Sequence, residues 1–125
     1  MAGILIGMKL ITGLSNPLLA QRIAKELNIE QVPVKISTFT NGEKRVKVEG
    51  DLHSQTVVLL QSLSHPVNDM IMELLLLADA VERLGATKII ALIPWMGYSL
   101  QDKVFRDGEP ISRSEERRVG KECRS

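Results

Sequence analysis

Two polar segments of this 125-residue chain carry the side chains best suited to ligand binding. The first consists of Phe39, Asn41, Gly42 and Glu43. Phe39 could stack on a purine ring, while Asn41 and Glu43 could pair with the exocyclic amine and ring nitrogens of adenine. An ordinary hairpin turn with a flanking aromatic residue would use the same residue types. Taken alone, this structural interpretation is the stronger one.

The second segment spans residues 94–112, PWMGYSLQDKVFRDGEPIS, and includes Trp95. It follows an apolar run at residues 89–93, which has the length of a buried strand rather than of a helix. Gly97 would permit a tight or positive-φ turn. The polar side chains that follow are Gln101, Asp102, Lys103, Arg106, Asp107 and Glu109. Ligands of open α/β sheets bind beyond the carboxyl ends of strands, so a binding role here is as strong an interpretation as an ordinary loop.

A β-hairpin is the element predicted to hold the first segment. Residues 32–38 and 43–48 each alternate apolar and polar side chains, as half-buried strands do. Thr40, Asn41 and Gly42 lie between them, and an Asn-Gly pair is the strongest short-range signal for a hairpin turn.

Helical periodicity predicts a first amphipathic helix that covers a sheet. Asn16 can cap this helix and Pro17 can take its first position. Its apolar residues recur at helical spacing, at Leu18, Leu19, Ile23 and Leu27. The charged residues on its other side are Arg22, Lys25 and Glu26. This pattern is typical of a surface helix with one apolar face.

A second, longer helix is predicted over residues 67–84. Asn68 or Asp69 can cap it, and Gly85 follows its end. Its apolar positions are Met70, Ile71, Leu74, Leu75, Leu77, Ala78, Val81 and Leu84. These positions cover more than one narrow stripe, which indicates either deep burial or contact with another subunit.

The predicted order of elements is strand, helix, hairpin, strand, helix, strand. The single strands are residues 9–12, 56–60 and 88–94. The run TVVLL at residues 56–60 is continuous in β-branched residues and leucine, as expected for a strand buried on both faces of a parallel sheet. The fold class is therefore α/β, a mainly parallel sheet sandwiched by helices with a protruding β-hairpin.

Composition is that of an ordinary soluble globular domain, with 44% apolar residues, 25% charged residues and a net charge of +1. This balance favours neither a nucleic-acid nor a membrane partner, and Cys123 has no second cysteine with which to form an internal disulfide. His53 and His65 have no partner at ligand spacing, so no metal site is predicted from them. Sequence motifs for a phosphate loop, a dinucleotide fingerprint or a nucleophile elbow are absent.

Both ends of the chain differ from its middle. Residues 1–7, MAGILIG, are too short an apolar run for a signal peptide, and we expect an overextended start before Met8. Residues 113–125, RSEERRVGKECRS, would be a solvated tail or a basic nucleic-acid patch on composition alone. They resemble a translated sequencing adapter, so we expect an adapter read-through after Ser112 and exclude them from functional argument.

Several stretches together resemble one family. ITGLSNPLLAQRIAKELNI, STFTNGEKRVKVEG, VVLLQSLSHPVNDMIMELLLLADAVERLGATKIIALIPWMGYSLQDK and GEPIS are similar to the amino-terminal domain of ribose-phosphate pyrophosphokinase, also called phosphoribosyl pyrophosphate synthetase. The resemblance covers residues 8–112, with its motifs in the family's order and approximate spacing. It implies a type I phosphoribosyltransferase-like fold and a cytoplasmic homo-oligomer.

The activity implied by the resemblance is transfer of the β,γ-diphosphoryl group of ATP, with Mg²⁺, to the C1 hydroxyl of ribose 5-phosphate. The hairpin residues Phe39, Asn41, Gly42 and Glu43 would reach the adenine of ATP held by a neighbouring subunit. A second group, Leu100, Gln101 and Asp102 with Lys103 nearby, would form the other side of the ATP site. The family's metal ligands, catalytic loop and ribose-phosphate loop would lie beyond this chain, so we expect the 125 residues alone to be inactive.

One residue departs from the family pattern. Where Leu100 stands, the family usually has arginine, which can stack on a base and hold phosphate oxygens in a fork. Arg106 could reach back in its place, and the run around Phe105 resembles a shorter loop form of some archaeal-type members. Leu100 also favours a second interpretation, a non-catalytic regulatory or assembly homologue. An unrelated α/β nucleotide-binding module is a third.

Overall fold

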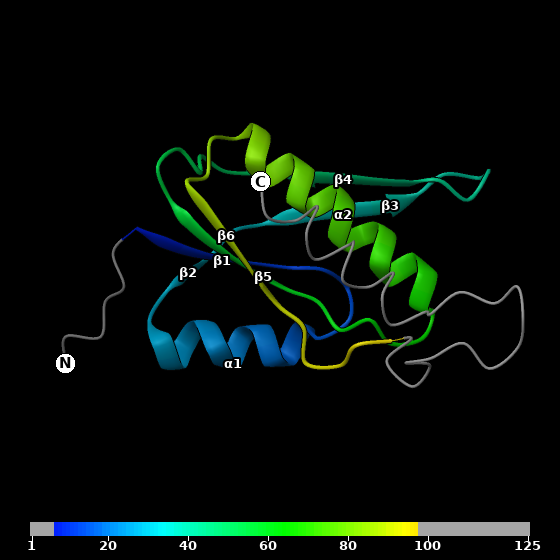
Figure 1. Cartoon of the computed structure of the whole chain (residues 1–125), viewed down its shortest axis with the longest axis horizontal. Helices are drawn as coiled ribbons and strands as arrows, with labels where there is room; N and C mark the ends of the chain where they lie inside the picture. The colour runs from blue at the N-terminus through cyan, green and yellow to red at the C-terminus, as the bar shows by residue number, and fades with distance from the viewer. Residues whose placement is uncertain (1–6, 98–125) are drawn as a thin grey trace, which may run out of the picture.

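A four-stranded parallel sheet forms the middle layer of the molecule (Figure 1). The computed structural model describes residues 7–97. Within them the sheet order is β2-β1-β5-β6. The strands are β1 (Met8–Thr12), β2 (Glu30–Gln31), β5 (Thr56–Leu60) and β6 (Lys88–Leu92). This arrangement confirms the predicted mainly parallel sheet, with the TVVLL strand β5 in its interior between β1 and β6.

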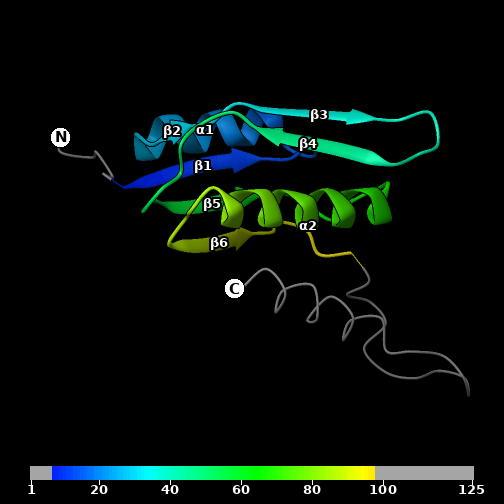
Figure 2. The same ribbon diagram turned by 90° about the horizontal axis from the view of Figure 1, so that it is seen from above.

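Helices and a hairpin cover the two faces of this sheet (Figures 1 and 2). Helix α1 (Pro17–Leu27) covers one face. Helix α2 (Val67–Arg83) and the antiparallel hairpin of β3 (Val34–Thr38) and β4 (Lys44–Val48) cover the other. Strand residues alternate between these layers, so that Leu10 packs toward α1 while its neighbour Ile11 packs toward α2.

Helix α2 has a broad apolar surface because it contacts both the sheet and β4. Leu74, Leu77 and Val81 have no exposed surface. The predicted caps are wrong, since the helix begins at Val67 with Pro66 at the N-cap position and without a side-chain capping bond. Asp69 lies instead in the first turn, where a negative charge stabilises the helix dipole. Two further features of the helix end, Leu84 as C-cap and Gly85 with a φ of 90°, agree with the predicted stop.

Helix α1 contacts the sheet through a narrower stripe than the sequence predicts. Ala20 is buried, and Ile23 and Ala24 pack beside it. Small alanines let the helix approach the sheet closely, which leaves the flanking Leu18 73% exposed and Leu27 46% exposed. The prediction that these leucines face the sheet is therefore wrong. Pro17 does begin the helix.

The cap of α1 also differs from expectation. Asn16 occupies the N-cap position but makes no side-chain capping bond. Its Oδ1 instead accepts a hydrogen bond from the hydroxyl of Ser15 at 2.8 Å. The side-chain oxygen predicted to cap the helix therefore has a partner in the preceding loop.

The strand predicted over residues 32–38 begins two residues later, as β3, and a separate short strand, β2, precedes it. Glu30 and Gln31 form β2 beside β1, and the backbone N–H of Val32 still donates to Leu10 O at 2.8 Å. Pro33 follows and has no N–H to continue a ladder. The chain then leaves the sheet and enters the hairpin, a change of direction that strand alternation alone does not reveal.

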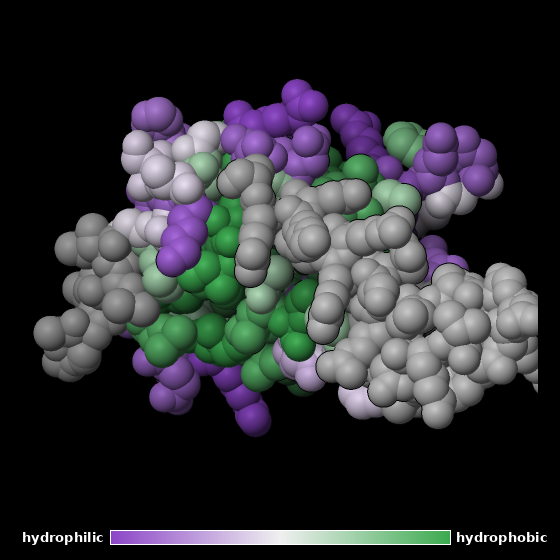
Figure 3. Space-filling model, viewed as in Figure 1, coloured by the Kyte–Doolittle hydropathy of each residue, from purple (hydrophilic) through white to green (hydrophobic). Residues whose placement is uncertain are grey.

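Strand β6 is the edge of the sheet within residues 7–97, where it pairs with β5. Ile90 is 37% exposed and Leu92 is 41% exposed. The prediction of a buried strand before Pro94 is thus correct in position and wrong in burial. On the face of the molecule that Figure 3 shows, apolar surface gathers in the middle and hydrophilic residues lie along the margins.

Two leucine truncations test this assignment of layers. We expect Leu77→Ala to lower the free energy of unfolding by about 2 to 5 kcal/mol, because it leaves a cavity under α2. Leu18→Ala should lower it by less than about 0.5 kcal/mol, because that side chain faces solvent. Urea unfolding followed by circular dichroism measures both. Equal losses in the two variants would show that α1 packs on the sheet through Leu18 after all.

Candidate functional site

The tip of the β3–β4 hairpin is a three-residue loop. Gly42 N donates to Phe39 O at 2.9 Å, and Phe39 N donates to Glu43 O at 2.7 Å. Gly42 has a φ of 92°, which residues with a side chain rarely adopt. The turn therefore forms where the Asn-Gly pair predicts it, and Gly42 is the residue that makes it possible.

The predicted hairpin residues lie together at this tip. The amide Nδ2 of Asn41 donates to Glu43 Oε2 at 2.6 Å, and Glu43 N donates to Asn41 Oδ1 at 3.0 Å. Both side chains are exposed, and Phe39 is 50% exposed. In Figures 1 and 2 the tip projects past the end of α2. An aromatic ring, an amide and a carboxylate are thus held close together and open to a partner.

The segment after β6 is joined to the end of β5. Leu63 N donates to Trp95 O at 2.7 Å, and Trp95 is 56% exposed. Gly97 does not have a positive φ. A Cβ added to it would lie 2.5 Å from Leu63 O, so close backbone packing is what requires glycine there. The predicted site residues Leu100, Gln101 and Asp102 lie outside the described residues, and their place beside the hairpin stays a prediction.

A buried polar network, missed by the sequence analysis, connects the hairpin to the sheet. Glu73 of α2 and Gln61 at the end of β5 have no exposed surface. The ammonium of Lys44 lies 3.0 Å from Glu73 Oε1. Oε2 of Glu73 accepts from Gln61 Nε2 at 2.7 Å and from the backbone N–H of Leu14 at 3.1 Å. Both carboxylate oxygens therefore have donors.

Gln61 extends the network into the loop between β1 and α1. Its Oε1 accepts from Ser15 N at 3.2 Å, and its Nε2 also lies 3.3 Å from Met70 O. The hydroxyl of Ser15 in turn accepts from Ser62 N at 2.8 Å. A Cβ on Gly13 would come within 2.4 Å of the Gln61 side chain, so glycine is required for this contact. The network thus holds the carboxyl ends of β1 and β5 together.

Two sequence signals could have found this network. Glu73 is the one charged residue in the otherwise apolar run MIMELLLL. Strand alternation also places Lys44 on the same face of β4 as Val46 and Val48, which is the inward face. A lysine on an inward face needs a buried partner, and a carboxylate inside an apolar helix is such a partner.

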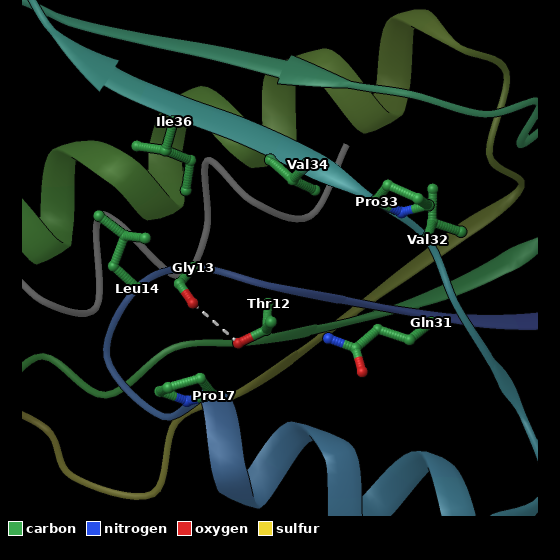
Figure 4. Close-up of a pocket in the computed structure, with 9 residues that line it drawn as sticks. All are labelled: Thr12, Gly13, Leu14, Pro17, Gln31, Val32, Pro33, Val34 and Ile36. Atoms are coloured by element: carbon green, nitrogen blue, oxygen red, sulfur yellow. Dashed lines mark hydrogen bonds between the residues drawn. The ribbon is translucent and has the colours of Figure 1, made fainter.

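A pocket of about 490 Å³ lies between the end of β1, the start of α1 and β3 (Figure 4). Its lining is mostly apolar and consists of Thr12, Gly13, Leu14, Pro17, Gln31, Val32, Pro33, Val34 and Ile36. The Thr12 hydroxyl lies within hydrogen-bond distance of the carbonyl oxygens of Gly13 and Leu60, at 3.0 and 3.2 Å. None of the four predicted hairpin residues is among the residues that line this pocket.

Other kinds of site are not seen in the part of the chain that the structure describes. Residues 7–97 hold no group of three or more His, Cys, Asp or Glu side chains that could bind a metal ion. His53 and His65 are both exposed. Neither of the two helices in this range is long and apolar enough to cross a membrane.

The Lys44–Glu73 pair can be tested against a matched surface lysine. We expect Lys44→Met to lower the free energy of unfolding by about 3 to 5 kcal/mol, because it leaves a buried carboxylate without its counter-charge. Lys35 lies on the outer face of the same hairpin, with a side chain 75% exposed and 3.7 Å from Glu49. Lys35→Met should therefore change stability by less than about 1 kcal/mol. Chemical denaturation of both variants measures the difference, and similar values would contradict the buried pairing.

Known proteins resemble this chain along most of its length. A protein-family model described as the N-terminal domain of ribose phosphate pyrophosphokinase matches residues 8–115. A ribose-phosphate pyrophosphokinase of Coxiella burnetii is 40% identical over 106 residues, which are 84% of this chain and 33% of that protein. Ribose-phosphate pyrophosphokinase 1 of Lactococcus lactis is 41% identical over 105 residues, 84% of this chain and 32% of that protein.

A solved structure agrees with these sequence matches. The crystal structure of phosphoribosylpyrophosphate synthetase from Mycobacterium smegmatis superposes with a TM-score of 0.84 and 33% identity, covering 94% of this chain and 38% of that one. The chain spans about one third of the length of the curated relatives it matches. On the match over residues 8–115, with a fold shared at this level, the chain belongs to the family of ribose-phosphate pyrophosphokinase N-terminal domains.

Proposed function

We propose that this chain is the amino-terminal part of an enzyme that makes phosphoribosyl pyrophosphate from ATP and ribose 5-phosphate. Membership of the pyrophosphokinase family supports the reaction class. In this reaction the C1 hydroxyl of the sugar attacks the β-phosphorus of ATP, the bond between the α- and β-phosphates breaks, and AMP leaves. The observation that carries the proposal is the exposed hairpin tip, which holds an aromatic ring, an amide and a carboxylate together.

The proposed role of this tip is adenine recognition. Phe39 would stack on the base, since flat aromatic faces pair well with purines. Glu43 would accept a hydrogen bond from the exocyclic amine of adenine. A carboxylate can accept several hydrogen bonds, and Asn41 donates only to Oε2. The hydrogen bonds between Asn41 and Glu43 hold both groups in place before the base arrives. This preorganisation reduces the entropy lost on binding.

We further propose that the nucleotide binds between two copies of the chain. The hairpin tip of one subunit would face the segment containing Leu100, Gln101 and Asp102 of its neighbour. A projecting tip with exposed binding groups is suited to such a shared site. Leu100 cannot contribute a charge to the phosphates, so that contact would fall to a basic side chain such as Lys103 or Arg106.

Magnesium enters this proposal only through the family. Mg²⁺ prefers oxygen ligands, and it would neutralise charge on the transferred diphosphoryl group. The described residues offer no cluster of carboxylates that fits the ion. These residues therefore contribute to binding and orienting the nucleotide, and no step of the reaction is assigned to a metal that they hold.

A regulatory or assembly homologue without activity of its own is the second candidate. Leu100 favours it, because a leucine stands where a phosphate-binding arginine would be expected. The two candidates differ in whether phosphoribosyl pyrophosphate is formed. A regulator would bind adenine nucleotide but would not form this product, even when joined to a complete second domain.

Nucleotide binding tests the adenine site directly. Isothermal titration of the purified chain should show ATP binding that GTP does not match, because guanine presents a carbonyl where adenine presents its amine. Phe39→Ala should weaken ATP binding about tenfold through loss of stacking. Thr40→Ala, at the same tip but without a ring, is the control and should bind like the wild type. Equal affinity for ATP and GTP, or no effect of Phe39→Ala, would remove the proposed adenine site.

Product formation is tested separately. The 125-residue chain should bind ATP without forming phosphoribosyl pyrophosphate, because phosphoryl transfer depends on a held metal ion and the described residues offer no group of side chains that could bind one. Incubation with ATP, Mg²⁺ and ribose 5-phosphate, followed by assay for AMP, measures this. Steady AMP release dependent on the sugar phosphate would show that the chain contains a complete site.

A further inference from the structure

We propose that Lys44 is a positioning residue that orients the hairpin tip through its buried ion pair with Glu73. This inference rests on the proposed function, since it assigns the lysine a role in presenting the adenine-binding tip. The lysine itself is separate from the groups that would touch the nucleotide. It acts on Phe39, Asn41 and Glu43 through the backbone of the hairpin.

Lys44 lies in the hairpin at the base of the tip, where a fixed side chain can orient the loop. Lys44 directly follows Glu43 and pairs with Thr38 on the last rung of the β3–β4 ladder before the loop. Its side chain points inward and is only 10% exposed, whereas Lys35 on the outer face is 75% exposed. The anchor therefore lies at the base of the projecting loop.

The acceptor of this ion pair is fixed in place. Glu73 has no exposed surface, and its second oxygen is held by Gln61 and by the backbone of Leu14. Gln61 is itself held by Ser15 N and lies against Met70. A carboxylate fixed by donors from two other segments cannot follow a moving lysine. The ammonium of Lys44 is consequently tied to one point on α2.

Within residues 7–97, no comparable contact lies further along the hairpin. The tip residues from Phe39 to Glu43 are all exposed, and in this range their hydrogen bonds are to one another. Val46 is the next inward residue on β4 and packs only partly against the core. Without the ion pair, the inward contact of β4 nearest to the tip would be that of Val46, two residues after Lys44. The tip would then sample a wider range of orientations. A tip that must reach a neighbouring subunit would then lose more entropy on binding.

The test must separate orientation from stability. Lys44→Met alone leaves a buried charge, so its effects would mix the two. The double variant Lys44→Met with Glu73→Gln removes both charges, while the glutamine carbonyl can still accept a hydrogen bond from Gln61 or Leu14. We expect the double variant to recover most of the stability lost in Lys44→Met and still to lack the tether.

Energy transfer can report the orientation of the tip without any nucleotide. Trp95 is the only tryptophan and serves as donor. An acceptor dye is attached to a cysteine introduced by Thr40→Cys, in a Cys123→Ser background. Time-resolved measurements should give a narrow distance distribution for the otherwise unmodified chain and for Lys35→Met. They should give a broad one for the double variant, and Lys44→Arg, which keeps the charge, should remain narrow.

ATP titration of the same variants without the dye links orientation to binding. The double variant should bind ATP about tenfold more weakly than the wild type, as expected for a binding element that has lost its preorganisation. An equally narrow distance distribution in the double variant, or a distribution in Lys44→Arg as broad as in the double variant, would overturn the positioning role. Broadening without ATP binding by any variant would support the tether and refute the adenine site instead.

Discussion

A carboxylate with no exposed surface is tolerated only where donors surround it, and in this domain that requirement is met at Glu73. The three donors that meet it come from different parts of the chain. Lys44 belongs to the hairpin, Gln61 to the end of β5, and Leu14 to the loop after β1, while α2 supplies the acid itself. One buried charge therefore ties the hairpin to α2, to the end of β5 and to the loop after β1. Apolar packing around the Glu73 carboxylate excludes water, so the loss of any one donor is costly.

The layered core gives this network its setting. Because β1 and β5 are parallel neighbours, their carboxyl ends lie at the same edge of the sheet, and the loops that follow them meet there. Gly13 allows the loop after β1 to approach Gln61, and Gly97 allows the segment after β6 to approach Leu63. The loops at this edge of the sheet are thus closely packed at Gly13 and Gly97, beside the pocket at the end of β1. Of the predicted site residues, the four that the structure describes, Phe39, Asn41, Gly42 and Glu43, lie at the hairpin tip.

The exposed position of the hairpin tip bears on the proposed function. The tip offers an aromatic ring and a hydrogen-bonding pair without an enclosing wall, so a second surface is needed to complete a nucleotide site. A site shared between subunits meets that need, and it explains why the hairpin would benefit from a firm anchor at its base. The matched residues make up about one third of the length of the relatives that share this domain, so the domain represents one part of the pyrophosphokinase architecture.

Local sequence patterns determined much of the fold. Strand runs, the Asn-Gly turn, Pro17 and Gly85 give correct elements because each acts through its own backbone neighbourhood. The short motifs also indicated the family, and the four hairpin residues do meet at one tip because the turn alone brings them together. The same local patterns predicted the cap of α2 incorrectly, and for α1 they gave the N-cap position but not a capping bond. In the first helix, the expected cap Asn16 has the hydroxyl of Ser15 as its partner, and no propensity scale records that contact.

Tertiary structure decided which apolar residues are buried and which polar residues are partners. Leu18 has the spacing of a core residue, but α1 meets the sheet through its alanines, so the leucine remains in solvent. Glu73 and Lys44 are 29 residues apart, and nothing local to either one identifies the other. Periodicity can place a side chain on a face of its own element. Only the packing of elements distant in sequence determines what that face meets, because burial and charge pairing are properties of the assembled layers.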